Sequence, residues 1–249
     1  MLTHERYKNI LDYLAERDAA TVSELAQATG TSESTIRRDL VALDKEGKLR
    51  KVYGGAAAIN KTEGISEDEI KIREVMMPEE KDMIAEYAVK LINNDDFVYI
   101  DSGTTTSRLI DHIGNTNATF VTNGIFHAQK LIAKGLKAYM LGGRIRAVTA
   151  SVVGSESIRN MLRYNFTKAF MGTNGIDIIS GFTTPDGDEA MLKEKAIEKS
   201  FAVFVLADHS KFRKVYPVTF AELGKCCIIT DKLPYSGFLD KTVIREVTK

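Results

Sequence analysis

The chain has 249 residues, of which 44% are hydrophobic and 27% charged, and its 34 basic residues balance its 34 acidic residues. This composition excludes a disordered chain and an unspecific basic coat for nucleic acid, and the length allows two domains. No apolar run is long enough to span a membrane, and the first residues lack a signal-peptide pattern, so we expect a cytoplasmic protein.

The start of the chain predicts two helices joined to a third by a short turn. Thr3 can cap a first helix that runs to about Arg17. A second helix is expected after Thr21, because Thr21 and Glu24 form a capping-box pattern. Gly30 suits the left-handed residue that ends a helix, so the chain turns tightly before the third segment.

Residues 31–43, TSESTIRRDLVAL, predict a third helix with two different faces. Ile36, Leu40 and Leu43 share one apolar side at helical spacing. The opposite side carries hydroxyl and guanidinium groups, which can bond base edges and phosphates in the major groove of DNA. An ordinary solvated face with surface ion pairs is the alternative. We expect the DNA contacts to come from Ser34, Thr35, Arg37 and Arg38.

A short basic stretch, KLRKVYGG at residues 48–55, follows the third helix and ends in two glycines. The pattern is typical of the small hairpin, or wing, of a winged helix-turn-helix. We expect Lys48, Arg50 and Lys51 to contact backbone phosphates. Since winged helices act in pairs on double-stranded operator DNA, we expect a homo-oligomer, either a dimer or a tetramer.

The composition changes after the wing. Residues 59–77 mix charges with few apolar residues and predict a linker between a DNA-binding domain at 1–58 and a second domain at 78–249. A helix is expected from Pro78. Beyond it, short apolar runs alternate with amphipathic segments, which predicts an α/β domain with a mostly parallel sheet covered on both faces. The expected strands are 97–100, 119–121, 138–141, 169–171, 203–207 and 227–229, and the expected helices include 107–113, 124–133 and 155–163.

Small polar residues follow several of these strands, where ligands of open α/β sheets bind. The segment DSGTTT at 101–106 combines a glycine, hydroxyls and the N–H groups of a helix N-terminus, which suits a phosphate group. A carboxylate and a lysine nearby favour a phosphorylated polyol over an apolar ligand. Ordinary turns and helix caps are the alternative. The expected effector residues at strand ends are Asp101, Gly103, Thr104, Thr105, Thr106, Thr122, Asn123, Gly142, Gly143, Arg144, Asp208 and Lys211.

Nucleotide cofactors and metals have no matching pattern. Neither GxGxxG nor GxxxxGK[ST] occurs. The chain has two cysteines, Cys226 and Cys227, whose side chains point to opposite faces of a strand, and we expect both to be small buried apolar residues. We therefore expect no cofactor, no metal and no catalytic residue.

The run from Glu5 to Ala56, with STIRRDL and a final GGA, closely resembles the N-terminal domain of the DeoR family of bacterial transcriptional repressors. From about Pro78 onward, the chain resembles the sensor domain of the same family. The motifs are DSGTTT, VTNG, LGGRIR, MGTNGID, GFTTPDGDEAMLK and VLADHSKF. That sensor domain is similar in fold to ribose-5-phosphate isomerase. The resemblance implies a phosphate site at Gly103, Thr104, Thr105 and Lys211, with Glu189 and Lys193 facing the sugar.

We therefore expect a repressor of a sugar-utilisation operon that a phosphorylated sugar releases from DNA. Within the family, the chain looks most like regulators of fructose operons, which respond to fructose 1-phosphate.

Glu189 and Lys193 are four residues apart and would share a helix face, although an ordinary surface pair is the alternative. An isomerase-like enzyme is the main rival, because Asp186, Asp188, Glu189 and Lys193 could supply a base and an electrophile. We expect no enzyme, since an attached DNA-binding domain makes sensing the simpler function. A third alternative is a second domain that only oligomerises, but this function would not explain the hydroxyl groups at the strand ends.

Overall fold

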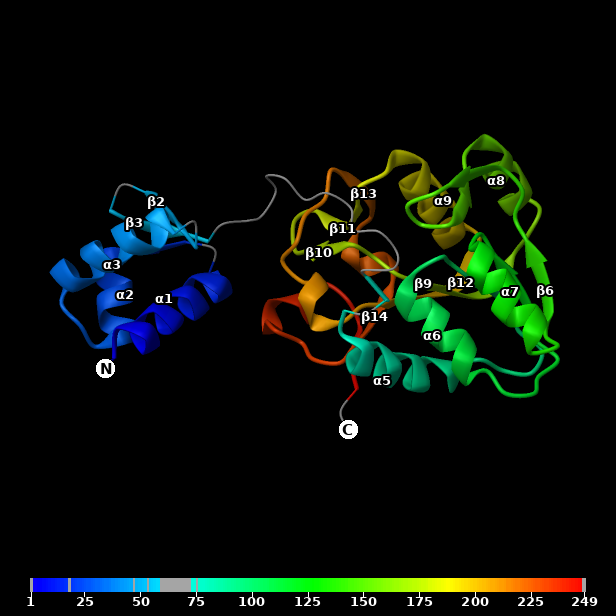
Figure 1. Cartoon of the computed structure of the whole chain (residues 1–249), viewed down its shortest axis with the longest axis horizontal. Coiled ribbons are helices and arrows are strands. Elements are labelled where there is room, and N and C mark those ends of the chain that lie inside the picture. Colours follow the sequence, from blue (N-terminus) through cyan, green and yellow to red (C-terminus); the bar gives the residue numbers. More distant parts are fainter. Residues whose placement is uncertain are drawn as a thin grey trace. The chain divides into compact units, whose positions relative to one another are not determined.

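The computed structural model describes residues 2–17, 19–46, 48–52, 54–58, 73–74 and 76–247. The chain divides into two compact units, Met1–Lys61 and Thr62–Lys249, and each has its own hydrophobic core (Figure 1). Most of the predicted linker at 59–77 lies outside the described residues, as does the side chain of Arg50.

The first unit is a three-helix bundle with a small antiparallel sheet. The helices are α1 (Thr3–Arg17), α2 (Val22–Thr29) and α3 (Glu33–Lys45), and the strands β1 (Ala19–Thr21), β2 (Arg50–Val52) and β3 (Gly55–Ala57) lie in the order β1-β3-β2. The predicted helices and wing are confirmed. The strand β1 was not predicted, because three residues are too few to show a periodicity.

The ends of the helices follow from their caps. The predicted capping box is present, with the N–H of Glu24 donating to Thr21 Oγ1 at 3.2 Å, and Gly30 ends α2 in the left-handed conformation at φ 64°. The third helix begins at Glu33 rather than at Thr31. The reason is that Ser32 is its N-cap and accepts the N–H of Thr35 on its hydroxyl at 3.3 Å.

The second unit is built on a parallel sheet. Its strands are β4 (Phe97–Ile100), β5 (Thr119–Thr122), β6 (Lys137–Met140), β9 (Phe166–Met171), β12 (Ser200–Leu206), β14 (Cys227–Thr230) and β15 (Ile244–Glu246). Their order is β15-β14-β12-β9-β4-β5-β6, and every neighbouring pair is parallel. The predicted α/β fold is thus confirmed, and the strands lie within a few residues of the predicted runs.

Helices cover both faces of this sheet. Figure 1 places α5 (Pro78–Val89) and α6 (Thr104–His112) on one side, and α8 (Ser155–Met161) and α9 (Gly187–Glu198) on the other. The helix α7 (Ile125–Ala133) joins α5 and α6 through a core that contains Ile84, Leu109 and Leu131. A second core, on the face of α9, contains Tyr99 and Leu192.

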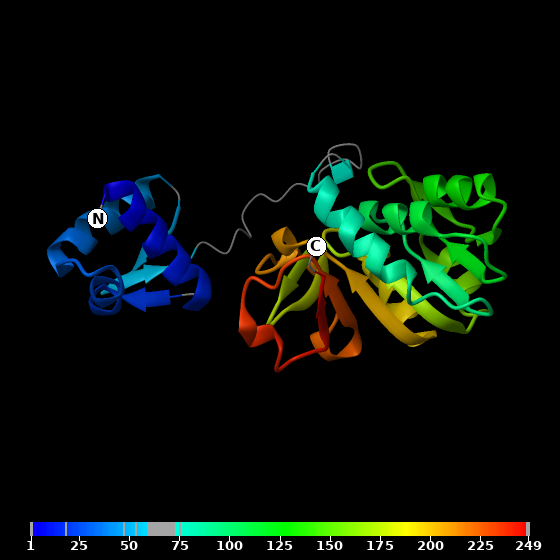
Figure 2. The same cartoon turned by 90° about the horizontal axis from the view of Figure 1, so that it is seen from below.

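Smaller elements complete the unit. The strands β10 (Gly175–Asp177), β11 (Gly181–Thr184) and β13 (Val218–Ala221) form an antiparallel sheet, and β7 (Arg144–Arg146) pairs with β8 (Ser151–Val153). Short 3-10 helices span His209–Lys211, Leu223–Lys225 and Ser236–Phe238. Figure 2 shows the C-terminal part, orange to red, gathered at the end of the unit away from α6 and α7.

Three further features concern the two cysteines, metal ligands and membrane-spanning helices. Cys226 is buried as predicted, whereas Cys227 is only half-buried, and both are free thiols. Within the described ranges, no group of three His, Cys, Asp or Glu side chains could hold a metal ion. No helix among the described residues is long and apolar enough to cross a membrane.

Candidate functional site

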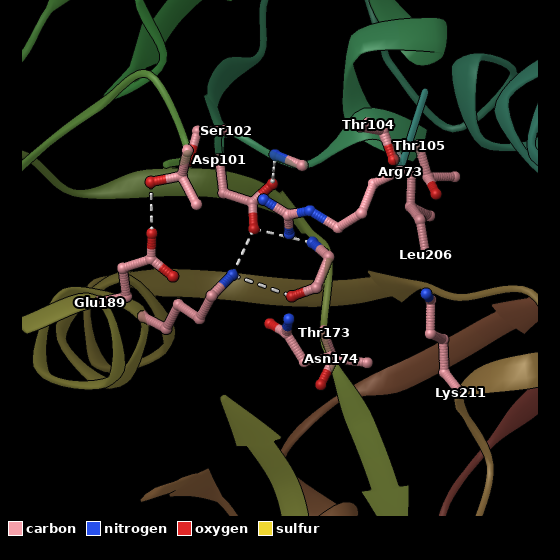
Figure 3. Close-up of a pocket in the computed structure, with 14 residues that line it drawn as sticks. Arg73, Asp101, Ser102, Thr104, Thr105, Thr173, Asn174, Glu189, Leu206 and Lys211 are labelled. Atoms are coloured by element: carbon pink, nitrogen blue, oxygen red, sulfur yellow. Dashed lines mark hydrogen bonds and ion pairs between the residues drawn. The ribbon is translucent and has the colours of Figure 1, made fainter. Parts of the chain in front are cut away.

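A pocket lies at the carboxyl ends of β4, β9 and β12, where the sequence predicts a ligand site (Figure 3). The loop after β4, the loop after β9 and the start of α9 supply most of its walls. The free volume inside it is about 50 Å³. Its lining consists of Arg73, Asp101, Ser102, Gly103, Thr104, Thr105, Thr149, Gly172, Thr173, Asn174, Glu189, Lys193, Leu206 and Lys211.

Asp101 holds these walls together. Its Oδ1 accepts the N–H of Gly103 and the hydroxyl of Thr106, both at 2.9 Å. Its Oδ2 accepts the N–H of Gly172 at 2.8 Å and Lys193 Nζ at 2.5 Å. Because four donors from three parts of the chain converge on this buried carboxylate, its main role is to fix the shape of the pocket.

The charge of Asp101 is maintained by the same contacts. Burial alone would raise the pKa of the carboxyl group, but Lys193 and the N–H groups of Gly103 and Gly172 outweigh burial and lower the pKa below its ordinary value. Asp101 and Lys193 therefore form a buried ion pair at neutral pH. Lys193 also donates to the carbonyl of Gly172 at 2.9 Å, which ties α9 to the loop after β9.

The N-terminus of α6 forms an anion cradle on one side of the pocket. Gly103 is the N-cap and makes no side-chain cap, so the first-turn N–H groups remain directed outward from the helix end. A Cβ at Gly103 would lie 3.2 Å from both Asp101 Oδ1 and Thr106 Oγ1, so glycine permits this close turn. Figure 3 shows Thr104, Thr105 and the ammonium of Lys211 on this side. The group of donors suits a phosphate.

Glu189 lies in the opposite wall, on the first turn of α9. It is 7% exposed, and its Oε1 accepts the hydroxyl of Thr149 at 2.6 Å and lies 3.5 Å from Arg146 Nη1. Lys193 follows one turn later and pairs with Asp101 rather than with Glu189. The two α9 residues thus share a face toward the pocket, and the alternative of an exposed surface pair is wrong.

Seven of the expected effector residues do not line this pocket: Thr106, Thr122, Asn123, Gly142, Gly143, Arg144 and Asp208. Protein groups bind at least one polar atom of most of these residues. The Thr106 hydroxyl bonds Asp101 and His127, and the Asn123 side chain accepts Tyr99 OH at 3.0 Å. The hydroxyl of Thr122 accepts the N–H of Gly124, the N–H of Gly142 donates to Asn160, and Asp208 caps the 3-10 helix at 209–211. Arg144 pairs with Asp188 at the surface at 2.5 Å, and Gly143 sits at the start of this hairpin with φ 144°.

Several lining residues were not predicted, and they differ in the signal that they leave in the sequence. Gly172, Thr173 and Asn174 follow a strand and obey the rule that identified the loop at 101–106. Ser102 and Leu206 adjoin expected positions. Arg73 and Thr149 come from outside the strand ends, and only the tertiary structure brings them to the pocket.

His127 supports the cradle from behind. Its Nε2 lies 3.0 Å from the carbonyl of Gly103 and 3.1 Å from Thr106 Oγ1, and the side chain is 2% exposed. Burial lowers the pKa of this imidazole to about 4, and the nearby Asp101 only partly opposes the effect. At neutral pH the ring is therefore uncharged and can donate its Nε2 proton to Gly103.

We expect His127 to make the second unit sensitive to mild acid. Its pKa is about 4 in the folded state and about 6.5 when exposed, so the unfolded chain binds the proton first as the pH falls. The contribution of neutral His127 to the free energy of unfolding is fully present above pH 6.5. It is lost progressively between pH 6.5 and pH 4, by up to about 3 kcal/mol. Urea unfolding at pH 7.5 and pH 5 measures the loss. His127→Gln keeps a donor but does not titrate, so an equal loss in this variant contradicts the assignment.

The first unit carries the candidate DNA interface. Ser34, Arg37 and Arg38 are exposed on α3, and Thr35 is half-buried. The apolar side, with Ile36, is buried as predicted.

The ion pairs of this unit are of two kinds: a buried pair that holds helices together, and exposed pairs whose cations could bind DNA phosphates. Asp39 is buried and binds Arg6 at 2.5 Å, so this pair holds α1 to α3. Arg37 pairs with Glu33 at 2.7 Å and Lys48 with Glu46 at 2.7 Å, but both pairs are exposed and contribute little to stability. Their cations can therefore exchange these partners for phosphates at small cost. Lys51 is also exposed, and a groove between α3 and the wing includes Arg37 and Lys51 in its lining.

Comparisons with known proteins cover the whole chain. The DeoR-like helix-turn-helix domain matches residues 6–62, and the DeoR C-terminal sensor domain matches residues 76–232. An uncharacterized HTH-type transcriptional regulator, FruR of Bacillus subtilis, is 40% identical over 99% of both chains. The HTH-type transcriptional repressor GlcR of the same organism is 32% identical over 96% of this chain and 93% of its own length. The lactose phosphotransferase system repressor of Staphylococcus aureus is 28% identical over 90% of each. Among solved structures, ribose 5-phosphate isomerase A of Methanocaldococcus jannaschii aligns with 58% of this chain and 55% of its own, at 16% identity and a TM-score of 0.40.

Proposed function

The chain belongs to the DeoR family of transcriptional regulators, and from this premise we propose that it is a repressor that a phosphorylated sugar releases from operator DNA. The observation that carries the proposal is the pocket of the second unit. It joins an anion cradle at Gly103–Thr105 and Lys211 to a wall of hydroxyl, amide and carboxylate groups. The cradle suits a phosphate, and the polar wall suits the hydroxyls of a sugar.

Fructose 1-phosphate is the effector that we propose first. The full-length relative at 40% identity is named FruR, and a more distant relative is named for a lactose phosphotransferase system. Both names fit a sugar as the signal. In the pocket, Glu189 and Asn174 would accept and donate hydrogen bonds to sugar hydroxyls, while Lys211 and the α6 N-terminus would hold the phosphate.

DNA binding is assigned to the first unit. Ser34, Thr35, Arg37 and Arg38 would enter the major groove, and Lys48, Arg50 and Lys51 of the wing would hold phosphates. Two such units are needed for a paired operator, so we propose a homo-oligomer, a dimer or a tetramer, that acts in the cytoplasm where the DNA is. For a ligand to release DNA, it must bind the DNA-incompetent arrangement more tightly than the competent one.

The geometry gives the enzyme alternative little support. Asp186 caps α9 and lies 3.1 Å from Arg146, and Asp188 pairs with Arg144 at the surface, so neither carboxylate lines the pocket. Glu189 and Lys193 do line it, but Lys193 is paired with Asp101. The curated relatives reported above are transcriptional regulators.

Thermal unfolding of the purified protein tests the proposal without knowledge of the operator. The series includes fructose 1-phosphate, fructose 6-phosphate, other sugar phosphates and free fructose. A ligand at one hundred times its dissociation constant should stabilise the folded state by about 2.7 kcal/mol. A shift with a phosphosugar and none with free fructose supports the sensor. The absence of any shift favours a domain that only oligomerises, and turnover of a phosphosugar favours the enzyme.

Lys211→Ala should weaken effector binding and leave DNA binding intact. Lys211 lines the phosphate side of the pocket from the segment after β12, and a hydrogen bond to a charged group contributes about 1.5–3 kcal/mol. The midpoint of the titration with fructose 1-phosphate should therefore rise by about tenfold or more. Lys90→Ala removes an exposed lysine of the same unit and serves as the control. An unchanged midpoint in Lys211→Ala would remove this residue from the phosphate site.

A further inference from the structure

Arg73 lines the pocket but does not come from the strand ends. It precedes α5, and it is the first described residue after Ala58. Figure 3 shows its side chain reaching inward among the pocket residues. Arg73 therefore belongs both to the pocket and to the short stretch that precedes α5.

The enclosed part of the pocket is small, and Arg73 is one of the side chains that line it. A free volume of about 50 Å³ holds roughly four water molecules, whereas small-molecule pockets usually measure roughly 300–1,000 Å³. A sugar phosphate therefore either extends into the open mouth of the pocket or displaces lining side chains. Lys193 and Glu189 are buried and fixed by hydrogen bonds from other elements. Arg73 is half-buried and has a long side chain, so its guanidinium can reorient toward a ligand.

Lys81 links Arg73 to the main helix of this region. Lys81 is 2% exposed, and its ammonium donates to the backbone carbonyl of Arg73 and, at 2.7 Å, to that of Met76. The chain then turns at Met77, whose φ of 50° is uncommon for a residue with a side chain. Because Lys81 binds both carbonyls, a displacement of the Arg73 backbone also acts on the Lys81 ammonium and on its contact with Met76.

The charges around Lys81 favour an anion in the pocket. Burial lowers the pKa of Lys81 to about 8, and the nearby cations Lys211, Arg73 and Arg108 act in the same direction, against the opposing effect of Asp208. Cations thus outnumber the one nearby carboxylate among these groups. A phosphate dianion would relieve this repulsion and would attract the guanidinium of Arg73.

We propose that Arg73 binds the phosphate of the effector and, through the Lys81 contacts, reports the occupied pocket to the chain segment that leads to the DNA-binding unit. The inference rests on the proposed function, because it requires a phosphorylated effector in this pocket. The guanidinium of Arg73 turns to the phosphate, and the backbone of Arg73 and Met76, which Lys81 binds, becomes better protected when the ligand is held there. Lys81 is a positioning residue in this scheme, since it holds the backbone of Arg73 and does not touch the effector.

Hydrogen exchange of the full-length chain, with and without saturating fructose 1-phosphate, tests the proposal. In the wild type, we expect amide exchange to slow by about tenfold both in the cradle at 101–106 and in residues 73–81. In Arg73→Ala, the ligand should bind about tenfold more weakly. At ligand concentrations raised to saturate this variant, the cradle should be protected and residues 73–81 should not. Arg73→Lys keeps the positive charge and should restore part of the protection.

Lys90→Ala is the control, because Lys90 is an exposed cation at the end of α5 that does not line the pocket. It should behave as the wild type in both segments. Protection of the cradle alone in the wild type would overturn the role of Arg73 and leave the sensor function standing. Equal protection of residues 73–81 in Arg73→Ala would overturn it as well. No protection in either segment with any sugar phosphate would instead refute the proposed function.

Discussion

Replacing Lys193 with methionine is expected to reduce the free energy of unfolding of the second unit by about 3 kcal/mol. Lys193 pairs with Asp101 at 2.5 Å, and the two side chains are 12% and 4% exposed. Methionine has a similar length but no charge, so the variant leaves a buried carboxylate without its main counter-charge. Denaturant unfolding of the wild type and the variant at pH 7 measures the difference. The effector response should be lost too, because the same pair aligns the loops at 101–106 and 172–174.

The control is the double variant Asp101→Asn with Lys193→Met. It removes both charges, and an amide keeps one acceptor for the N–H of Gly103 or Gly172. We expect the double variant to be more stable than Lys193→Met alone, and adding the single variant Asp101→Asn completes the cycle that isolates the pair. The pH gives a second check. The pKa of Asp101 is lowered in the folded wild type, so its contribution is present above the ordinary carboxyl range and disappears as the pH falls through the folded value. The difference in free energy of unfolding between the wild type and Lys193→Met should therefore become smaller in acid. A difference that does not change with pH would contradict a role of charge.

The pocket shows what strand-end reasoning can find. The sequence predicts Gly103, Thr104 and Thr105 as pocket residues, because a parallel strand ends immediately before them and a helix begins immediately after them. Both features are local. Lys211 is found in the same way, although it is distant in sequence, since the carboxyl ends of parallel strands meet at one edge of the sheet.

The same rule selects too many residues, because it does not show which polar side chain turns inward. Thr106 and Thr105 are adjacent in one helix turn, but the Thr106 hydroxyl is directed to Asp101 and His127 while Thr105 lines the pocket. Asn123 ends the neighbouring strand, yet Tyr99 OH and the carbonyl of Val152 use its amide. Side-chain direction at a helix start depends on tertiary partners, which no local pattern contains.

The residues that the sequence does not predict are those whose position depends on tertiary structure alone. Arg73 lies in a stretch that reads as a charged linker, and nothing in its neighbours indicates a pocket. The buried ammonium of Lys81, which binds the carbonyls of Arg73 and Met76, helps to place these two residues. The strands β7, β8 and β10 have three residues each, so they are too short for alternation to appear.

On the DNA side, Arg38→Ala is expected to weaken operator binding by about 1–3 kcal/mol, which corresponds to about 5- to 150-fold in affinity, and to relax the base preference. Arg38 is exposed on α3, on the side opposite the buried Ile36, and its forked guanidinium can bond the O6 and N7 of guanine. Binding to a duplex selected from random sequences, and to its single-base variants, measures both effects. Arg17→Ala removes an exposed arginine of α1 that packs over Tyr13, outside α3 and the wing, and should change neither.

Lys51→Ala separates base reading from phosphate contact in the same assay. Lys51 lies on the wing strand β2 and is exposed, so it should contact a phosphate and weaken binding equally on every duplex. The slope of log affinity against log salt concentration should also become shallower by about one, because about one fewer counterion is released. Arg38→Ala should instead change the ranking of the duplexes. If Arg38→Ala weakened all duplexes equally and lowered the salt slope as Lys51→Ala does, Arg38 would be a phosphate contact, and base recognition would have to come from Ser34, Thr35 or Arg37.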